Sequence, residues 1–378
     1  MKIGILAGES SGDLIGSMLI KTLSKLDPNL AVEGMGGPLM IEAGCKSLFD
    51  INRLSVMGFI EPLKRLPDLM RLSNDVCRHF IANRPDVFIG IDSPDFNFNV
   101  EKKLHAVGIP IIHYVSPSVW AWRRYRVRKI AKIVDLMLTL FPFEADFYKA
   151  HHVPCRYVGH PLAERIPFQI ETLAARRALG IEEDKTYVAL LPGSRHQEIR
   201  YLAEPLLLAA KKIQQALPDV RFLVSFVNPK HTAAFAHAKQ AVAFDLPIHF
   251  FENRSHDILA ASNVVIVKSG TATLETMLFK KPMVIVYRTS RLAYFLAKCL
   301  VHTPYIGLPN LLANKRLVPE LIQEAATPDA IADAALHYLQ HPDQCTQLQH
   351  QFEALHLELM VGVGAADAVR EFMSTCSA

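Results

Sequence analysis

Short apolar runs alternate with longer amphipathic segments along most of this chain, and the alternation limits the folds it can adopt. Near-continuous runs of Val, Ile and Leu are typical of strands buried on both faces. The segments between them carry apolar residues at helical spacing, as in residues 14–25 and 97–107. This repetition predicts parallel sheets covered by helices on both sides. The apolar runs lie at residues 2–7, 86–92, 110–116, 134–141, 186–192, 220–226, 247–251, 263–268 and 282–287.

The pattern is interrupted at GHPLAERIPFQIETL, residues 159–173, where two prolines and several polar residues indicate a linker. A chain of 378 residues suits two domains. We therefore expect an α/β protein with two Rossmann-like, doubly wound parallel-sheet domains and a hinge between them. Ligands of such sheets bind beyond the carboxyl ends of the strands, which predicts a site in the interdomain cleft. The expected parts are residues 1–168, residues 169–345, and a helical tail, 346–378, for which packing back on the first domain is one option.

Charge and cysteine content exclude several classes of protein. A net charge of +4 permits an anionic substrate or membrane surface but does not require nucleic acid. The six cysteines form no CxxC pair, so neither a zinc site nor a disulfide framework is indicated, and we expect reduced thiols. The apolar stretch at the N-terminus is too short for a signal peptide. No apolar run approaches the roughly 20 residues that span a bilayer.

One strand is followed by a loop suited to an anion. The apolar run ending at Leu191 leads into Gly193, Ser194 and Arg195, and a helical pattern starts directly afterwards. Free N–H groups and the dipole of a helix N-terminus attract anions, glycine permits close approach, and arginine can bind phosphate through two nitrogens. The alternative is a simple helix cap beside a surface arginine.

A second loop of the same kind strengthens the first interpretation. The strand at residues 263–268 is followed by Ser269, Gly270 and Thr271, and then by a helix. Two hydroxyl-rich helix starts in one domain predict a site for a nucleotide diphosphate. Glu275, one helical turn further on, could accept both hydroxyls of a ribose, although dipole-favoured carboxylates are also common in first turns.

Other nucleotide motifs are missing from the sequence. No G-x-G-x-x-G follows the first strand, so a dinucleotide oxidoreductase is poorly supported. No GxxxxGK[ST] occurs, which argues against a P-loop enzyme. No DxD occurs, so a sugar-nucleotide site here need not hold a divalent metal.

The N-terminal half has polar strand ends of its own. GESSGD, residues 8–13, follows the first strand, and its Glu9, Ser10, Ser11 and Asp13 could hydrogen-bond a polyhydroxylated acceptor. The alternative is that Ser11 or Asp13 caps the next helix. Asp92 ends another buried strand and is a candidate general base. The alternative for Asp92 is a helix N-cap, which is the interpretation we prefer for Asp95.

Aromatic residues and a histidine complete the set of candidates. His113 lies in a predicted buried strand, and SPSVWAWR follows it at residues 116–123. Trp120 and Trp122 could stack on a sugar or form the wall of an acyl pocket, and packing in the core is the alternative.

The motifs, taken together, resemble lipid-A-disaccharide synthases. GESSGD, GIDSPDFN, YVSPSVWAWR, FPFE, VGHPL, LLPGSR-x-x-EI, SGTATLE and LPNLLA occur in the order typical of that family, over essentially the whole chain. The resemblance implies the GT-B fold of an inverting, metal-independent glycosyltransferase without a cofactor. The implied donor is UDP-2,3-diacylglucosamine, the implied acceptor is 2,3-diacylglucosamine 1-phosphate, and the products are the β-1,6-linked disaccharide 1-phosphate and UDP.

The resemblance also assigns roles to residues. Asp92 and Arg195 match positions regarded as essential in the family, and Glu9 and Asp13 stay eligible as the base. The nucleotide-binding side would include residues 269–271, Glu275 and Asn310. Arg195 and the two helix N-termini would stabilise the charge that builds on the departing UDP.

Lipid substrates imply contact with an anionic membrane surface, at the cytoplasmic side of the inner membrane of a Gram-negative-type bacterium. The best sequence candidate is residues 56–72, where apolar residues at helical spacing stand beside basic ones, although an ordinary core-facing helix is the alternative. The basic run RRYRVRKIAK, residues 123–132, is a second candidate surface, a phosphate site or a solvated helix face. The predicted membrane contacts are Phe59, Ile60, Leu63, Leu66 and Met70.

Two rival functions fit parts of this pattern. A UDP-sugar epimerase or hydrolase would need the nucleotide loops but no lipid surface. A lipid- or nucleotide-binding module would need no base. Homo-oligomerisation stays open, and nucleic acid is not expected as a partner.

Overall fold

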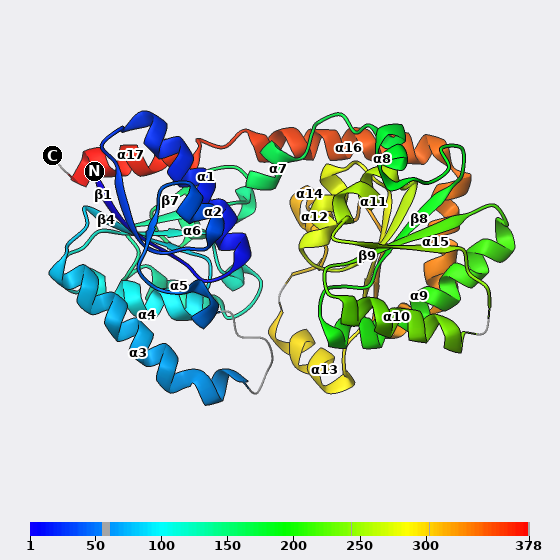
Figure 1. The fold of residues 1–378 in the computed structure, drawn as a ribbon, viewed down its shortest axis with the longest axis horizontal. Coiled ribbons are helices and arrows are strands. Elements are labelled where there is room, and N and C mark those ends of the chain that lie inside the picture. The colour runs from blue at the N-terminus through cyan, green and yellow to red at the C-terminus, as the bar shows by residue number, and fades with distance from the viewer. Residues whose placement is uncertain (55–60, 243, 302, 377–378) are drawn as a thin grey trace. The chain divides into compact units, whose positions relative to one another are not determined.

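The chain forms two compact units, and the first is built from both ends of the sequence. This computed structural model describes residues 1–54, 61–242, 244–301 and 303–376, with the side chains of residues 61–66 outside the description. The first unit contains residues 1–161 and 359–378, and the second contains residues 162–358 (Figure 1).

The first unit contains a parallel sheet of seven strands in the order β3-β2-β1-β4-β5-β6-β7. Its strands are β1 (Lys2–Ala7), β2 (Ala31–Met35), β3 (Lys46–Ser47), β4 (Val87–Ile91), β5 (Ile111–Tyr114), β6 (Leu136–Thr139) and β7 (Cys155–Tyr157). Its helices are α1 (Ser10–Leu26), α2 (Pro38–Glu42), α3 (Glu61–Ala82), α4 (Pro94–His105), α5 (Val127–Ile130), α6 (Pro142–Ala150) and α17 (Ala365–Cys376). The short helix α7 (Pro161–Arg165) begins at the boundary, and its residues from 162 onward belong to the second unit.

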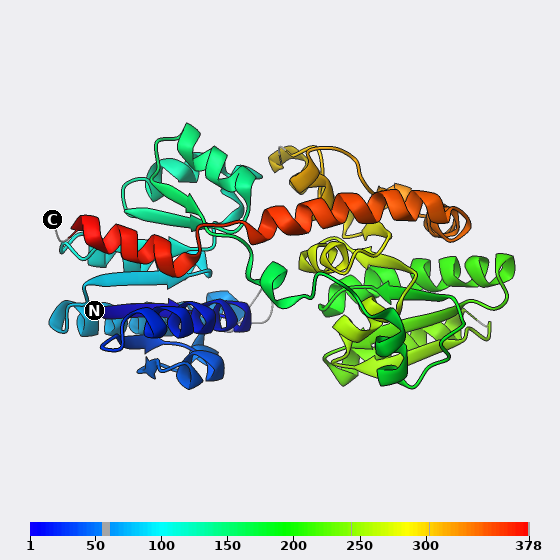
Figure 2. The same cartoon turned by 90° about the horizontal axis from the view of Figure 1, so that it is seen from above.

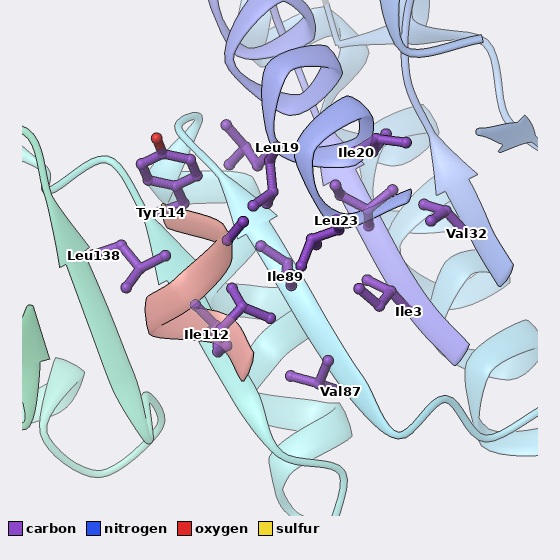
Figure 3. Close-up of a cluster of buried hydrophobic side chains, with 14 of the residues drawn as sticks. Ile3, Leu19, Ile20, Leu23, Val32, Val87, Ile89, Ile112, Tyr114 and Leu138 are labelled. Carbon is purple, nitrogen blue, oxygen red and sulfur yellow. The ribbon is translucent and has the colours of Figure 1, made fainter. Parts of the chain in front are cut away.

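Helices cover both faces of this sheet, as the continuous apolar strands predict. One hydrophobic cluster joins the sheet to α1 and α17, and another joins it to α3, α4 and α6. Figure 3 shows Leu19, Ile20 and Leu23 of α1 directed at Ile3 and Ile89 of the sheet.

The second unit repeats the architecture with six parallel strands in the order β10-β9-β8-β11-β12-β13. Its strands are β8 (Tyr187–Leu191), β9 (Arg221–Phe226), β10 (Ile248–Glu252), β11 (Val264–Lys268), β12 (Met283–Tyr287) and β13 (Glu320–Ile322). Its helices are α8 (Thr172–Leu179), α9 (His196–Ala216), α10 (Pro229–Ala241), α11 (Ser255–Ala261), α12 (Thr271–Leu278), α13 (Arg291–Leu300), α14 (Leu308–Ala313), α15 (Pro328–Gln340) and most of α16 (Pro342–Met360).

The predicted fold class is confirmed in its two parallel-sheet domains and its helical C-terminal tail. The tail returns the chain to the first unit through a close backbone crossing (Figure 2). His160 N–H donates to the Leu359 carbonyl, and Val363 N–H donates to the Tyr157 carbonyl. A Cβ on Gly362 would collide with the backbone at residues 158–159, so glycine is required where the two segments cross.

The last helix completes the core of the first unit. Ala366, Ala368 and Val369 of α17 are buried in the same cluster as Ile112 and Leu138 of the sheet. Because the sheet face beneath α17 is apolar, the helix contributes to stability through burial of apolar surface.

Val369→Ala is expected to lower the free energy of unfolding of the first unit by about 2 kcal/mol, since it removes two buried methyl groups and leaves a small cavity. Urea unfolding would measure the change, with Arg370→Ala, at an exposed neighbour on the same helix, as the control. Equal stability of the two variants would contradict a structural role for α17.

Candidate active site

Two of the predicted motifs meet at the carboxyl edge of the first sheet. β1 pairs with β4 in a register that sets Ala7 opposite Ile91, so the residues that follow these two strands are neighbours. A Cβ on Gly8 would collide with the Ser93 hydroxyl. Gly8 therefore lets the GESSGD loop lie directly against the loop that carries Asp92.

The backbone around Asp92 is held in an unusual conformation. Asp92 and Ser93 have φ angles of 53° and 43°, and Val115 and Arg123 have φ angles of 79° and 55°. Left-handed conformations are costly for residues other than glycine, most of all for β-branched valine. Four such residues within or beside one pocket indicate that the surrounding structure fixes the shape of this site, as is typical of functional sites.

These residues border a pocket of about 360 Å³ at the ends of β4 and β5. Asp92 is half-buried there, and none of the described residues donates a hydrogen bond to its carboxylate. The pocket thus combines an available carboxylate with basic and aromatic side chains. It is lined by Asp92, Pro94, Asp95, Val115, Ser116, Pro117, Ser118, Val119, Trp122, Arg123 and Arg126.

The two arginines of the pocket differ in whether a carboxylate of the protein already pairs with them. Arg126 lies 2.6 Å from the Asp95 carboxylate in an ion pair. The exposed Arg123 has its guanidinium 4.2 Å from the centre of the Trp122 ring. Arg123 is therefore the cation of this pocket that is better placed to bind a phosphate, and Trp122, not Trp120, lines the pocket.

A buried polar cluster lies behind Asp92, and sequence reasoning missed most of it. The Asn97 amide donates to the carbonyls of Ile91 and Asp92, at 3.2 and 2.6 Å, and so anchors the left-handed segment. Glu101 and His113 form a fully buried pair with 2.7 Å between Oε1 and Nδ1. One oxygen of Asn97, one of Glu101 and Nε2 of His113 have no hydrogen-bond partner among the described residues. Such atoms cost about 1–3 kcal/mol each, a cost that proteins retain mainly at functional sites.

The polar residues of GESSGD are placed differently. Glu9 and Ser11 are exposed at the start of α1, free to meet a ligand. Asp13 is buried, and its carboxylate accepts hydrogen bonds from the N–H groups of Gly37, Leu39 and Met40. These three bonds occupy the carboxylate, so we assign Asp13 to holding the N-terminus of α2 rather than to proton transfer.

Trp120 belongs to a buried network beside the pocket. Its indole N–H donates to Glu144, whose carboxylate also accepts the backbone N–H groups of Leu140 and Phe141. Burial raises the pKa of the Glu144 carboxyl to about 8, against the opposite effect of these hydrogen bonds. Glu144 was not singled out from the sequence, although the FPFE motif contains it.

In the second unit, the two predicted phosphate loops lie side by side. β8 pairs with β11 so that Leu191 faces Val267, and the loops begin directly beyond these residues. Gly193 has φ of 113°, a conformation that favours glycine. The parallel register thus confirms that the loops share one edge of the sheet.

Glu198 closes the first of these loops and joins it to the second. Its carboxylate accepts the N–H groups of Ser194 and Arg195, at 3.0 and 3.2 Å, and lies 2.8 Å from the Lys268 ammonium. Burial acts to raise the pKa of Glu198, but the Lys268 ammonium and the two backbone donors lower it below its usual value. The N-terminus of α9 is therefore occupied by an internal anion, a role that the Arg195-x-x-Glu198 spacing of a capping box could have predicted.

The N-terminus of α12 is open by comparison. Gly270 and Thr271 are exposed, and no described residue accepts the N–H groups of residues 270–272. The Arg195 side chain is 83% exposed, and its ion pair with Glu198 is long, at 3.7 Å. Arg195 can therefore reach a ligand. These donors, with Lys268, make the described carboxyl edge of the second sheet suitable for an anion.

Ser269 and Asn310 hold the loops of this edge together. The Ser269 hydroxyl donates to the Ile306 carbonyl. The buried Asn310 amide donates to Val318 and Glu320 and accepts the N–H groups of residues 317 and 318. Glu275 is half-buried on α12 and lies 3.8 Å from His256. The predicted nucleotide residues that keep atoms available to a ligand include Ser194, through its exposed hydroxyl, as well as Arg195, Gly270, Thr271 and Glu275.

The predicted membrane contacts are only partly described. Phe59 and Ile60 lie outside the described residues, and so do the side chains of Leu63 and Leu66 on α3. Met70, on the same helix, is 57% exposed. No helix within the described part of the chain combines the length and apolarity needed to cross a membrane. Nor do the described residues contain a group of three or more His, Cys, Asp or Glu side chains suited to a metal ion.

Comparison with known proteins identifies the family. The model of the family described as lipid-A-disaccharide synthetase matches residues 3–363. The lipid-A-disaccharide synthase of Saccharophagus degradans is 46% identical over 360 residues, which cover 95% of this chain and 92% of that relative. The chain belongs to the lipid-A-disaccharide synthase family.

This member of the lipid-A-disaccharide synthase family is also similar in fold to solved structures. The UDP-GlcNAc 2-epimerase of Neisseria meningitidis, solved with UDP-GlcNAc, aligns with a TM-score of 0.64 at 12% identity, over 100% of this chain and 99% of that one. A calicheamicin glycosyltransferase aligns with a TM-score of 0.59 at 14% identity, over 100% of this chain and 99% of that one. At such identities the likeness shows the two-domain GT-B fold alone.

Glu198→Ala is expected to lower the free energy of unfolding of this lipid-A-disaccharide synthase family member by about 1–3 kcal/mol. The substitution leaves two backbone donors and the partly buried Lys268 ammonium without their acceptor. Urea unfolding would measure the loss, with Glu204→Ala, at an exposed glutamate of the same helix, as the control. If both variants were as stable as the wild type, Glu198 would not hold the two loops.

Stability should also depend on pH through Glu144. The native chain keeps a proton on Glu144 up to a pKa of about 8, whereas the unfolded chain releases it near 4.5. This group's contribution is therefore fully present below about pH 4.5 and is lost as the pH rises through about 8. The unfolding free energy of the wild type minus that of Glu144→Gln, from denaturation at several pH values, should fall across this window. A constant difference would refute the buried, protonated carboxyl.

Proposed function

We propose that this chain condenses UDP-2,3-diacylglucosamine with 2,3-diacylglucosamine 1-phosphate, giving the β-1,6-linked lipid A disaccharide 1-phosphate and UDP. The observation that carries the proposal is the 46% identity to a lipid-A-disaccharide synthase over 95% of the chain. The geometry of the two sheet edges supports it, because one offers an available carboxylate and the other offers donors for an anion.

The first unit supplies the acceptor chemistry in this proposal. Asp92 takes the proton from the acceptor 6-hydroxyl as the oxygen attacks C1 of the donor sugar, so the proton ends on the Asp92 carboxylate. Its half-buried position and the absence of a donor among the described residues leave both oxygens available. Arg123 binds the 1-phosphate of the acceptor, which suits its exposure in the same pocket. Ser11 and Glu9 contribute hydrogen bonds to the sugar.

The second unit supplies the leaving-group chemistry. The bond between C1 and the diphosphate oxygen breaks through an oxocarbenium-like state, and the electron pair leaves with UDP. The N–H groups at the start of α12 and the Arg195 guanidinium stabilise the charge that develops on the diphosphate. Glu275 accepts the ribose hydroxyls, while Ser269 and Asn310 fix the loops. We propose that no divalent metal takes part.

The acyl chains of both substrates determine where the protein works. We propose that it associates peripherally with the cytoplasmic face of the inner membrane of a Gram-negative-type bacterium. Residues 56–72 are the proposed contact in the first unit, and of the five predicted contact residues Met70 is the one whose side chain the structure describes, in an exposed position.

The reaction is tested by incubating the purified protein with the UDP-linked donor in detergent, with and without the acceptor, in the presence of EDTA. Disaccharide and UDP that form only with acceptor would support the proposal, including its metal independence. Release of UDP without disaccharide would point to hydrolysis and would overturn the proposed reaction. Loss of disaccharide formation in EDTA would overturn the metal-independent mechanism.

Two substitutions separate the roles of the two units. Asp92→Asn should lower kcat by at least about 100-fold, because asparagine keeps the left-handed backbone but cannot accept the proton. Arg195→Ala should cost on the order of 100- to 1000-fold in kcat through lost stabilisation of the leaving group. Steady-state kinetics would measure both, with Arg316→Ala, at another exposed arginine of the second unit, as a control.

Glu9→Gln tests whether Glu9, rather than Asp92, is the general base. Near-normal turnover of Asp92→Asn together with inactive Glu9→Gln would transfer the role to Glu9. Near-normal turnover of Arg195→Ala would exclude its assigned role.

A further inference from the structure

Helix α13 (Arg291–Leu300) differs from the other long helices of the second unit because none of its residues is buried. Tyr294 is half-buried, and the other nine residues of the helix are exposed. Figures 1 and 2 show α13 at the periphery of its unit, away from the sheet. The helix is therefore not held by a core contact of the kind that stabilises α9.

The exposed side chains form an apolar stripe. Leu292, Phe295, Leu296, Cys299 and Leu300 recur at intervals of three and four residues, which brings them to one face of a helix. The relative exposures of Leu292, Phe295 and Leu296 are 71%, 64% and 52%. A contiguous exposed apolar face of this kind marks a binding surface, since single exposed apolar residues are common but such stripes are normally buried.

The charge around the stripe has one sign. Arg291 and Lys298 are exposed on the helix itself, and the sequence has no acidic residue between Glu275 and Glu320. An apolar face flanked by basic residues is the composition of a helix that lies in the interface of an anionic bilayer.

We propose that α13 is an interfacial helix that binds an anionic lipid surface and seats the second unit on the membrane. Leu292, Phe295 and Leu296 enter the acyl region, while Arg291 and Lys298 contact lipid phosphates. The proposal rests on the proposed function in one respect, because the lipid nature of both substrates gives the protein a reason to contact a membrane. It adds a membrane contact in the second unit to the one expected at residues 56–72 in the first.

The same charges argue against a second copy of the chain as the occupant. A two-fold interface through this helix would bring equivalent surfaces together, so Arg291 and Lys298 of each copy would approach like charges. An anionic bilayer instead attracts each of these basic side chains at its surface.

The test is flotation of the full-length protein with vesicles made of equal parts phosphatidylglycerol and phosphatidylcholine, compared with vesicles of phosphatidylcholine alone. Leu292→Glu/Phe295→Glu should reduce partition to the anionic vesicles by about tenfold or more, because two carboxylates replace the apolar side chains that would enter the acyl region. Arg291→Ser/Lys298→Ser should reduce partition to anionic vesicles and leave the weaker binding to neutral vesicles unchanged.

The matched control is Leu173→Glu/Leu357→Glu, which adds the same two charges at exposed leucines elsewhere in the second unit. It should bind vesicles like the wild type, and thermal unfolding should show all three variants folded. Wild-type-like partition of a folded Leu292→Glu/Phe295→Glu variant would overturn the proposal. So would a change confined to its oligomeric state in size-exclusion chromatography, which would identify a second copy as the occupant. Because flotation requires no turnover, a failure of the proposed reaction would not affect this result.

Discussion

Parallel pairing of neighbouring strands is the constraint on which both candidate sites depend. In the first sheet it sets Ala7 opposite Ile91, and in the second it sets Leu191 opposite Val267. Polar residues that are far apart in the sequence therefore meet at the carboxyl edge of each sheet. The helices on both faces keep these strands dry, so that the chemistry is confined to the loops at the edge.

The two edges are prepared for different charges. In the first unit, strained backbone and the Asn97 amide present the Asp92 carboxylate without a donor among the described residues. In the second, Glu198 uses two backbone donors and Lys268 to fix the loop that carries Arg195, leaving the start of α12 for a ligand. The Glu198 carboxylate also limits the net positive charge of this edge of the sheet, because it pairs with the Lys268 ammonium.

The acylated substrates of the proposed reaction reside in a bilayer, so the proposed function calls for a contact between the protein and the membrane surface. In our proposal, the exposed stripe of α13 and the basic residues beside it provide this contact in the second unit. A contact that belongs to the second unit would hold the leaving-group machinery at the surface where acylated substrates reside. Because no residue of α13 is buried, we expect substitutions on its exposed face to leave the core intact.

The sequence by itself determined the parallel-sheet domains, nine of their strands, and the loops that carry Asp92, Arg195 and Thr271, but not the short strands β2, β3, β7 and β13. Apolar periodicity and glycine-containing loops at the ends of strands are local signals, and they can be recognised in the sequence without knowledge of how the chain packs. Tertiary structure alone decided that Asp13 and Asn310 are consumed by internal hydrogen bonds, that Glu198 and Lys268 join two loops, and that α13 stays uncovered. Whether a polar or apolar side chain is free depends on partners brought together by folding, and no local pattern records those partners.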